Sequence, residues 1–434
     1  MNKNTAFLSA LLLFTSLSTA YTQDWPQFMG PDRTSISSQK GLLRTWPEQG
    51  PEILWSVNMG IGYGGPVVKN GKIYILDRND EVGDIMRCIN LADGKELWKF
   101  AYDAPGSVSF PGSRSVPIVD DRFVYSCGPY GDLYAIDINT HKPVWNKNVW
   151  KDFGGEKIPT WAISQCPLFY GDLLILASQA PQAGVVAYDK KSGDLKWKTE
   201  SLGLVGYVSP ALVKIDGKDH VVMVTASGRD GAKGKVVGID PTTGKILWEY
   251  ANWNCSIPVP SAVDAGNNKI LVTGGYELGA TMIQVEKKSD GTYGTKELFS
   301  TVEFGDQTKS PILYKGYFYA QYGTNSRRDG MACMSMDGQI MWKTKREPDF
   351  NKGSMILADG LILATDGTRS LFLVEPDPAG FKALASAEVL KEPVVEGAAA
   401  PRGGAAQNWA PIALADGKLL IRDQSRLLCV KVAK

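Results

Sequence analysis

The sequence predicts an all-β protein, an eight-bladed β-propeller whose first strand closes the ring by joining the last blade. Three observations carry this prediction: a tryptophan that returns after a recurring turn, a short proline-containing segment that recurs along the chain, and incomplete units at the two ends. Repeats of about 40–50 residues with strand-type sequence between turns are typical of propellers and related arrays.

The recurring tryptophan follows a turn that contains Asp-Gly, Thr-Gly or a variant of these pairs. The phrases LADGKELW, INTHKPVW, KKSGDLKW, PTTGKILW and SMDGQIMW end at Trp98, Trp145, Trp197, Trp248 and Trp342. Trp55 lacks the turn, and Phe299 takes the same position in a degraded copy. Alternating apolar residues between the turns predict four strands per copy, which make one blade. The tryptophan then lies in the outermost strand, where its ring packs on the next blade and its N–H reaches a backbone acceptor.

Each blade is predicted to start with small residues and a proline. Proline at the start of a strand removes no ladder hydrogen bond, and small residues suit the crowded centre of the ring. The eight starts are Gly64–Val68, Ser115–Val119, Gln165–Phe169, Val208–Leu212, Val259–Val263, Lys309–Leu313, Gly353–Leu357 and Trp409–Ala413.

The two ends of the chain are predicted to complete one blade together. The last unit contains three apolar runs and stops at Lys434 without a tryptophan strand, whereas Ile53–Asn58 is a tryptophan strand that precedes the first full blade. Pairing of Ile53–Asn58 with Leu427–Val432 would close the ring and remove a free sheet edge.

The first residues predict export. Lys3 precedes an apolar stretch from Ala6 to Leu17, and Ser18-Thr19-Ala20 is a small-residue cleavage site. We therefore expect a signal peptide at residues 1–20, a lead-in segment at 21–50, a single propeller domain at 51–434, and a periplasmic or extracellular protein. The apolar stretch is too short for a transmembrane segment. No cysteine precedes Cys88, so we do not expect a lipoprotein.

Charge, cysteine and histidine content restrict the possible functions. Lys and Arg number 47 against 46 Asp and Glu, which gives no reason to expect a nucleic-acid partner. The two histidines are interpreted as solvated turn residues, which disfavours a histidine-rich metal site and a Ser-His-Asp triad. The cysteines fall in separate repeats, so disulfides are not expected. These residues are His141 and His220, and Cys88, Cys127, Cys166, Cys255, Cys333 and Cys429.

The segments AIDINTHKPVW, AYDKKSGDLKW and GIDPTTGKILW share the phrase A/G-x-D-x-x-T/S-(G)-x-x-x-W. This phrase resembles that of the eight-bladed quinoprotein-like propellers, which include the pyrroloquinoline quinone (PQQ) dehydrogenases and the outer-membrane assembly lipoprotein BamB. The resemblance covers most of Trp25 to Lys434. The opening Trp25–Arg33 also resembles the lead-in of many uncharacterised secreted members. The phrase is specific for the fold and carries little information about activity.

The resemblance implies chemistry that this sequence matches only in part. Many PQQ dehydrogenases carry adjacent cysteines, a calcium ion held by Glu, Asn and Asp, an Asp base, and in some cases haem on C-x-x-C-H. Neither Cys-Cys nor C-x-x-C-H occurs here. We therefore expect no cofactor, and PQQ with calcium belongs to an alternative hypothesis. The glycine run from Gly60 to Gly65 leads into a strand, so a phosphate-binding loop is not predicted.

Residues just before each innermost strand are expected to face the central funnel, where closed β architectures bind ligands. Aromatic and cationic side chains there suit a flat or ring-shaped ligand that is anionic or carbonyl-rich. A solvated channel is the alternative. The predicted positions are Tyr63, Arg114, Trp161, Gln165, Tyr207, Lys309, Lys352, Asn408 and Trp409.

The leading functional hypothesis is a BamB-like binding or scaffold propeller with a protein or carbohydrate (glycan) partner. The alternative is an enzyme that uses the funnel, either a PQQ-dependent quinoprotein dehydrogenase or a carbohydrate-active enzyme. An enzyme needs convergent groups that include a carboxylate acid or base. The predicted funnel positions contain no carboxylate, although Asp152, Glu156 and Asp306 lie on neighbouring loops.

Overall fold

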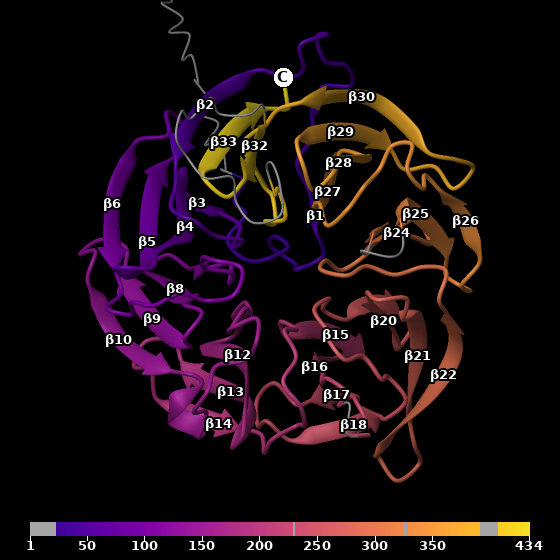
Figure 1. The fold of residues 1–434 in the computed structure, drawn as a ribbon. Coiled ribbons are helices and arrows are strands. Elements are labelled where there is room, and N and C mark those ends of the chain that lie inside the picture. The colour runs from indigo at the N-terminus through magenta and orange to yellow at the C-terminus, as the bar shows by residue number, and fades with distance from the viewer. Residues whose placement is uncertain (1–22, 229–230, 324–327, 391–406) are drawn as a thin grey trace, which may run out of the picture.

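The structure is a computed structural model that describes residues 23–228, 231–323, 328–390 and 407–434. Its described strands form eight sheets arranged as blades around a centre (Figure 1). The predicted signal peptide at 1–20 lies outside the described residues. So does nearly all of the irregular Lys391–Gln407 segment, which the sequence suggests is a long inter-blade loop.

The strands of each blade follow one another along the chain from the innermost to the outermost. Blade 1 contains β3 (Val67–Lys69), β4 (Lys72–Asn79), β5 (Gly83–Asn90) and β6 (Glu96–Ala101). Blade 2 contains β7 (Ile118–Val119), β8 (Phe123–Cys127), β9 (Asp132–Asp137) and β10 (Pro143–Asn148). Blade 3 contains β11 (Leu168–Tyr170), β12 (Leu173–Ala180), β13 (Ala183–Asp189) and β14 (Leu195–Lys198). Blade 4 contains β15 (Ala211–Ile215), β16 (Lys218–Val224), β17 (Val236–Ile239) and β18 (Ile246–Tyr250).

The second half of the ring repeats this order, with one addition. Blade 5 contains β19 (Val263–Gly266), β20 (Lys269–Gly274), β21 (Gly279–Lys287) and β22 (Tyr293–Thr301). Blade 6 contains β23 (Ile312–Tyr314), β24 (Tyr317–Gly323), β25 (Arg328–Ser335) and β26 (Ile340–Lys343). Blade 7 contains β27 (Met355–Ala358), β28 (Leu361–Thr365), β29 (Ser370–Glu375) and β30 (Lys382–Glu388), and the short β1 (Ile36–Ser37) pairs with β27 in parallel. A short 3₁₀ helix, η1 (Lys151–Phe153), follows β10.

Blade 8 is built from both ends of the chain, as the sequence predicts. β31 (Ala413–Ala415), β32 (Lys418–Arg422) and β33 (Arg426–Lys431) are completed by the outermost strand β2 (Ile53–Asn58). β2 pairs antiparallel with β33, from Ile53 opposite Val430 to Asn58 opposite Arg426. The predicted closure of the eight-bladed ring is therefore confirmed.

The tryptophans dock each blade onto the next. Trp55 Nε1–H donates to the carbonyl of Leu91 at 3.1 Å, and Trp145 Nε1–H donates to that of Lys190 at 2.9 Å. A Cβ at Gly94 would lie 2.8 Å from the Trp55 ring, so only glycine allows this ring to lie flat on the neighbouring turn. In these two contacts a large ring packs on the next blade and its N–H reaches a backbone acceptor, as predicted for the repeat.

The two histidines differ from each other. His141 is an exposed turn residue with φ 61°, as predicted, and its ring stacks on Trp98 with centroids 5.0 Å apart. The prediction for His220 was wrong, because this side chain is buried with 1% exposure. β16 starts at Lys218, so His220 lies within a strand and turns inward, and its Nδ1 accepts the Nε1–H of Trp248 at 2.9 Å. Burial lowers the pKa of His220.

A belt of hydroxyl groups joins the starts of the innermost strands. Ser261 Oγ–H donates to the carbonyl of Ser209 at 2.8 Å, and Ser310 Oγ–H donates to that of Ser261 at 2.8 Å. Ser115 Oγ–H donates in the same way to Gln165 at 2.9 Å. The small residues predicted at the blade starts therefore do more than fit a crowded centre, since they also link neighbouring blades.

The glycine run before blade 1 allows blades 1, 2 and 8 to approach closely. A Cβ at Gly64 would lie 2.5 Å from the carbonyl oxygen of Ser115, and one at Gly65 would lie 2.2 Å from that of Pro411. These glycines are therefore required for close packing of the blades. This role agrees with the sequence analysis, which did not predict a phosphate-binding loop here. The six cysteines, one in each of six different repeats, are all buried free thiols.

Candidate functional site

The predicted funnel residues lie on the connections that run from the outermost strand of one blade to the innermost strand of the next. Because successive blades repeat the same strand order, these connections emerge on one face of the ring. Tyr63 precedes β3, Arg114 precedes β7, and Lys352 precedes β27. Trp161, Tyr207, Lys309 and Trp409 occupy the equivalent connections before β11, β15, β23 and β31.

Trp409 is the centre of the contacts at this face. The ring of Tyr63 stacks on it with centroids 5.7 Å apart and an angle of 26° between the planes. The Nζ of Lys352 lies 4.7 Å from the centroid of the Trp409 ring, and Lys309 Nζ–H donates to the Trp409 carbonyl at 2.8 Å. The Phe110 ring lies 6.4 Å away, measured between centroids. These contacts bring residues from five connections together.

A second group extends the site around the face. Trp161 and Tyr207 meet edge to face with ring centroids 6.0 Å apart, and the Trp161 backbone N–H donates to the Tyr207 hydroxyl at 3.3 Å. Arg114 interacts electrostatically with both Tyr63 and Tyr207, which connects the two groups. We call the combined set the mouth cluster: Tyr63, Phe110, Arg114, Trp161, Tyr207, Lys309, Lys352 and Trp409.

Arg114 is engaged with its own loop. Its Nη1–H donates to the carbonyl of Gly112 at 3.1 Å, and its Nη2–H groups donate to the carbonyls of Ser109 and Phe110. Phe110 has φ 54° and a side chain that is 45% exposed. A bulky residue in the left-handed region is strained, and such strain persists only where neighbouring groups enforce it. The Arg114 guanidinium therefore holds Phe110 outward beside Trp409.

Burial reduces the basicity of the cations at the mouth. It lowers the pKa of Arg114 to about 10, against the opposing effect of Tyr63, and that of Lys309 to about 8, against the opposing effect of Asp306. Burial also lowers the pKa of Lys352, and the charge of Arg328 adds to the effect. Poorly hydrated cations gain most from an anionic or carbonyl-rich group placed between them.

Asp306 lies three residues before Lys309 in the chain and is committed to the backbone. Its Oδ1 accepts the N–H groups of Thr308 and Lys309, both at 2.9 Å, and its Oδ2 accepts that of Gln321 at 3.3 Å. Burial raises its pKa to about 6. Asp152 and Glu156 are exposed, and Asp152 Oδ2 accepts the Asn148 N–H at 2.9 Å.

Two predicted funnel residues point elsewhere. Gln165 is fully buried, where its Nε2–H donates to the Gly206 carbonyl at 3.0 Å and its Oε1 accepts the Ser164 N–H. It therefore links neighbouring connections. Asn408 is also fully buried, and neither polar atom of its side chain has a hydrogen-bond partner among the residues that the structure describes. Phe110 was missed by the sequence reasoning, although its position before Pro111 in an inter-blade connection was a usable signal.

The donor groups at the mouth do not fit a calcium-bound quinone. Within the described residues, no group of three or more His, Cys, Asp and Glu is placed to hold a metal ion. Asp306 gives its oxygens to backbone N–H groups and has the Lys309 ammonium nearby, which would repel a divalent cation. The aromatic rings and cations alone would suit a flat anion. We therefore derive no step through such a cofactor.

No helix in the described part of the chain has the length and apolar character needed to cross a membrane.

Three comparisons place the chain among known proteins. The quinoprotein alcohol dehydrogenase PedH of Pseudomonas putida KT2440 is 25% identical over 173 residues, which are 38% of this chain and 27% of that protein. The chain therefore matches about a quarter of that relative's length. The crystal structure of BamB from Moraxella catarrhalis has a TM-score of 0.56 at 12% identity, covering 88% of this chain and 99% of that one. A europium-containing methanol dehydrogenase has a TM-score of 0.62 at 13% identity, covering 92% and 89%.

At these identities the likeness to solved structures shows the fold alone. A family model gives a more specific result, because the family described as outer membrane protein assembly factor BamB matches residues 82–344. That segment is more than half of the chain and includes the tryptophan repeats from Trp98 to Trp342. The chain therefore belongs to the BamB-like family of PQQ-repeat β-propellers.

Proposed function

We propose that this protein is an exported binding propeller that holds a protein or glycan partner at the mouth cluster and catalyses no reaction there. One observation carries the proposal: the mouth presents fixed aromatic rings and cations, whereas Asp306, the carboxylate three residues before Lys309, is saturated by three backbone N–H groups. A carboxyl group that acts as a general acid or base must be free to face its substrate. The mouth therefore supports recognition better than acid–base chemistry.

The geometry suits recognition because the aromatic groups are already ordered. Tyr63 and Lys352 fix the ring of Trp409 from their own connections, and the Arg114 guanidinium holds Phe110 outward. A surface that is rigid before binding loses little conformational entropy when a partner arrives. Lys309 and Lys352 would favour partners with anionic or carbonyl-rich groups, and the rings would favour flat or cyclic ones.

A quinoprotein dehydrogenase is the second candidate, and the names of the relatives favour it. PedH is a quinoprotein alcohol dehydrogenase, although it matches only 38% of this chain. The two candidates differ in one decisive measurement. Purified protein is supplied with PQQ and calcium, then offered alcohols and sugars with an artificial electron acceptor. We expect no turnover above the protein-free control, and sustained turnover would overturn the binding proposal.

The binding proposal has its own test with point variants. A glycan array and chemical crosslinking to co-exported proteins would first identify a ligand for the wild-type chain. Phe110→Ala and Lys352→Ala should then each weaken its binding at least tenfold, with little change in thermal unfolding. Tyr276→Ala is the matched control, because Tyr276 is an exposed aromatic residue on the loop between β20 and β21. Equal binding by all three variants would exclude the mouth cluster as the site.

A further inference from the structure

The lead-in segment before β2 crosses the opposite mouth of the central channel. Trp25 exchanges two backbone hydrogen bonds with Val68 of β3, at 2.8 and 2.9 Å, and the Pro26 carbonyl accepts the N–H of Val119 of β7 at 3.0 Å. The Ser35 carbonyl then accepts the N–H of Leu357 of β27 at 2.9 Å. One short segment is therefore tied to the innermost strands of blades 1, 2 and 7.

Arg33 extends these contacts to the far side of the ring. Its Nη1–H donates to the Pro167 carbonyl at 2.9 Å and its Nη2–H donates to the Pro210 carbonyl at 3.0 Å, just before β11 and β15. Its guanidinium lies 5.6 Å from the centroid of the Phe28 ring. Burial lowers the pKa of Arg33 to about 10. The cation is thus held inside the ring by the backbone of blades 3 and 4.

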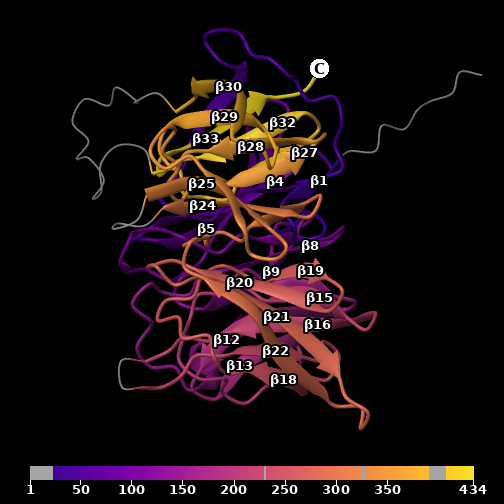
Figure 2. The same cartoon turned by 90° about the vertical axis from the view of Figure 1, so that its right-hand side faces the viewer.

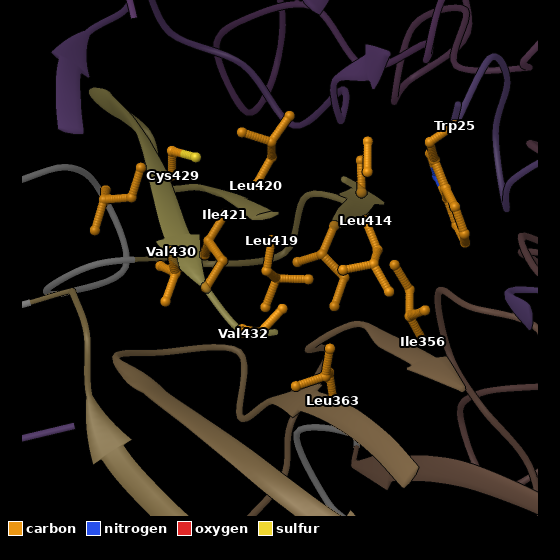
Figure 3. Close-up of a cluster of buried hydrophobic side chains, with 14 of the residues drawn as sticks. Trp25, Ile356, Leu363, Leu414, Leu419, Leu420, Ile421, Cys429, Val430 and Val432 are labelled. Carbon is orange, nitrogen blue, oxygen red and sulfur yellow. The ribbon is translucent and has the colours of Figure 1, made fainter. Parts of the chain in front are cut away.

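The segment is compact in itself. The N–H of Gly30 donates to the Gln27 carbonyl at 3.0 Å, and the N–H of Ser35 donates to that of Met29 at 2.9 Å. Gly30 has φ 81°, and a Cβ there would lie 2.7 Å from the Trp25 ring, so this turn requires glycine. The Trp25 ring lies beside Ile356 and Leu414 in a buried apolar cluster (Figure 3).

Two cavities lie beside this segment. A larger one of about 210 Å³ lies between Met29, Arg33 and Ile36 of the segment and the innermost strands of blades 4 to 6. A smaller one of about 20 Å³, room for about one water molecule, lies on the side of Lys309. Trp25, Phe28 and Met29 line it from the lead-in, and Lys309 and Asp306 line it from the ring. Lys309 reaches the Trp409 carbonyl of the mouth cluster on its other side. β1, which continues the segment, lies near one face of the ring in side view (Figure 2).

We propose that residues 24–37 form a plug that closes the central channel, so that the funnel is a blind pocket with the mouth cluster at its single entrance. The inference rests on the proposed function in one respect, which is the kind of partner. A glycan or peptide chain cannot thread through a blind pocket. It must lie across the mouth or insert one end.

Cys166 gives a direct test of closure, because its side chain is 4% exposed and interacts electrostatically with both Arg33 and Lys309. The folded protein is treated with N-ethylmaleimide, and each cysteine is quantified by peptide mass spectrometry. Gly30→Val should displace the plug by steric conflict with Trp25, and Arg33→Ala should release it from blades 3 and 4. Gly380→Val is the matched control, because a Cβ at Gly380 meets nothing within 4 Å.

We expect Cys166 to react at least tenfold faster in both plug variants than in the wild type or the control. Cys88 and Cys333 should stay protected, which would show that the blades remain folded. Hydrogen exchange at Val68 and Val119 reports whether the plug has left its strands. Fast exchange with an unreactive Cys166 would overturn closure, and slow exchange in both variants would overturn the roles of Arg33 and Gly30. No ligand is needed, so these outcomes are independent of the proposed function.

Discussion

Replacing Arg422 with methionine should weaken the joint that closes the ring. Arg422 ends β32 of blade 8 and is fully buried. Its Nη1–H groups donate to the carbonyls of Gly64 at 2.8 Å and Leu76 at 3.0 Å, and its Nη2–H donates to that of Gly60 at 2.9 Å. All three acceptors belong to blade 1 or the connection that leads into it, so one side chain links the last blade to the first.

The size of the effect follows from the groups left behind. Arg422→Met keeps most of the aliphatic stem but removes the donor from three carbonyls, two in buried and one in a partly buried hydrogen bond, at a cost of about 1–3 kcal/mol for each buried group. Burial lowers the pKa of Arg422 to about 10, which shows that the folded state disfavours its charge. Removing that charge recovers part of the cost, so the lower end applies. We expect a loss of about 3 kcal/mol in the free energy of unfolding.

Equilibrium urea unfolding followed by tryptophan fluorescence measures this loss. Arg122→Met is the control, because Arg122 is exposed and its Nε lies 3.8 Å from Oδ2 of Asp137. An ion pair that water reaches contributes about 0–1 kcal/mol. If Arg422→Met loses no more stability than Arg122→Met, the closure does not depend on the buried guanidinium, and the prediction is wrong.

Three further outcomes are expected. Burial lowers the pKa of His220, so the unfolded chain binds a proton more readily than the folded protein. The free energy of unfolding should therefore fall as the pH drops below about 6.5. In thermal unfolding between pH 8 and 5, His220→Gln should reduce this dependence of stability on pH. Burial raises the pKa of Asp306 to about 6, so the stability that its protonated form contributes is present at acid pH and is lost as the pH rises through about 6. Asp306→Asn should flatten this part of the curve of stability against pH. An unchanged curve would contradict the assignment of this pH dependence to Asp306. Trp145→Phe should cost about 1 kcal/mol more than Trp98→Phe in urea unfolding, because Trp145 Nε1–H has a carbonyl partner and Trp98 Nε1–H has none in the described part of the chain. Equal losses for the two variants would contradict this prediction.

The blade order could be predicted because one residue type fixes the register in each repeat. Trp55 and Trp145 both dock on the turn of the following blade, and this geometry places the strands before and after them. The closure of the ring could be predicted from the same pattern. The first tryptophan strand has no blade of its own and the last blade lacks a tryptophan strand, so the two can pair. The prediction for His220 was wrong because the preceding DGKD turn suggested a solvent-exposed side chain. β16 starts early enough to bring the His220 ring into the core.

The site could be predicted only in part, because position in a repeat sets the face of the ring but not the hydrogen bonds made there. The repeat placed Tyr63, Lys352 and Trp409 on the same face, where they meet. It could not show that Arg114 would bind carbonyls of its own loop. The contacts of Arg33 were equally hidden, since its two acceptors lie 134 and 177 residues away in the chain.

The two faces of the ring have different chemistry, and this difference narrows where a partner can bind. On the mouth face, long connections present Phe110 and Lys352, both with positive φ, and the Phe110 ring is exposed. On the opposite face, short turns and the lead-in segment satisfy one another, as where the Gly41 N–H donates to Asp359 Oδ2 at 3.1 Å. Polar groups already satisfied within the protein gain little from a new partner, whereas exposed rings and poorly hydrated cations gain more. A scaffold role and a small-ligand role therefore both depend on the mouth face, and variants at Phe110 and Lys352 test them together.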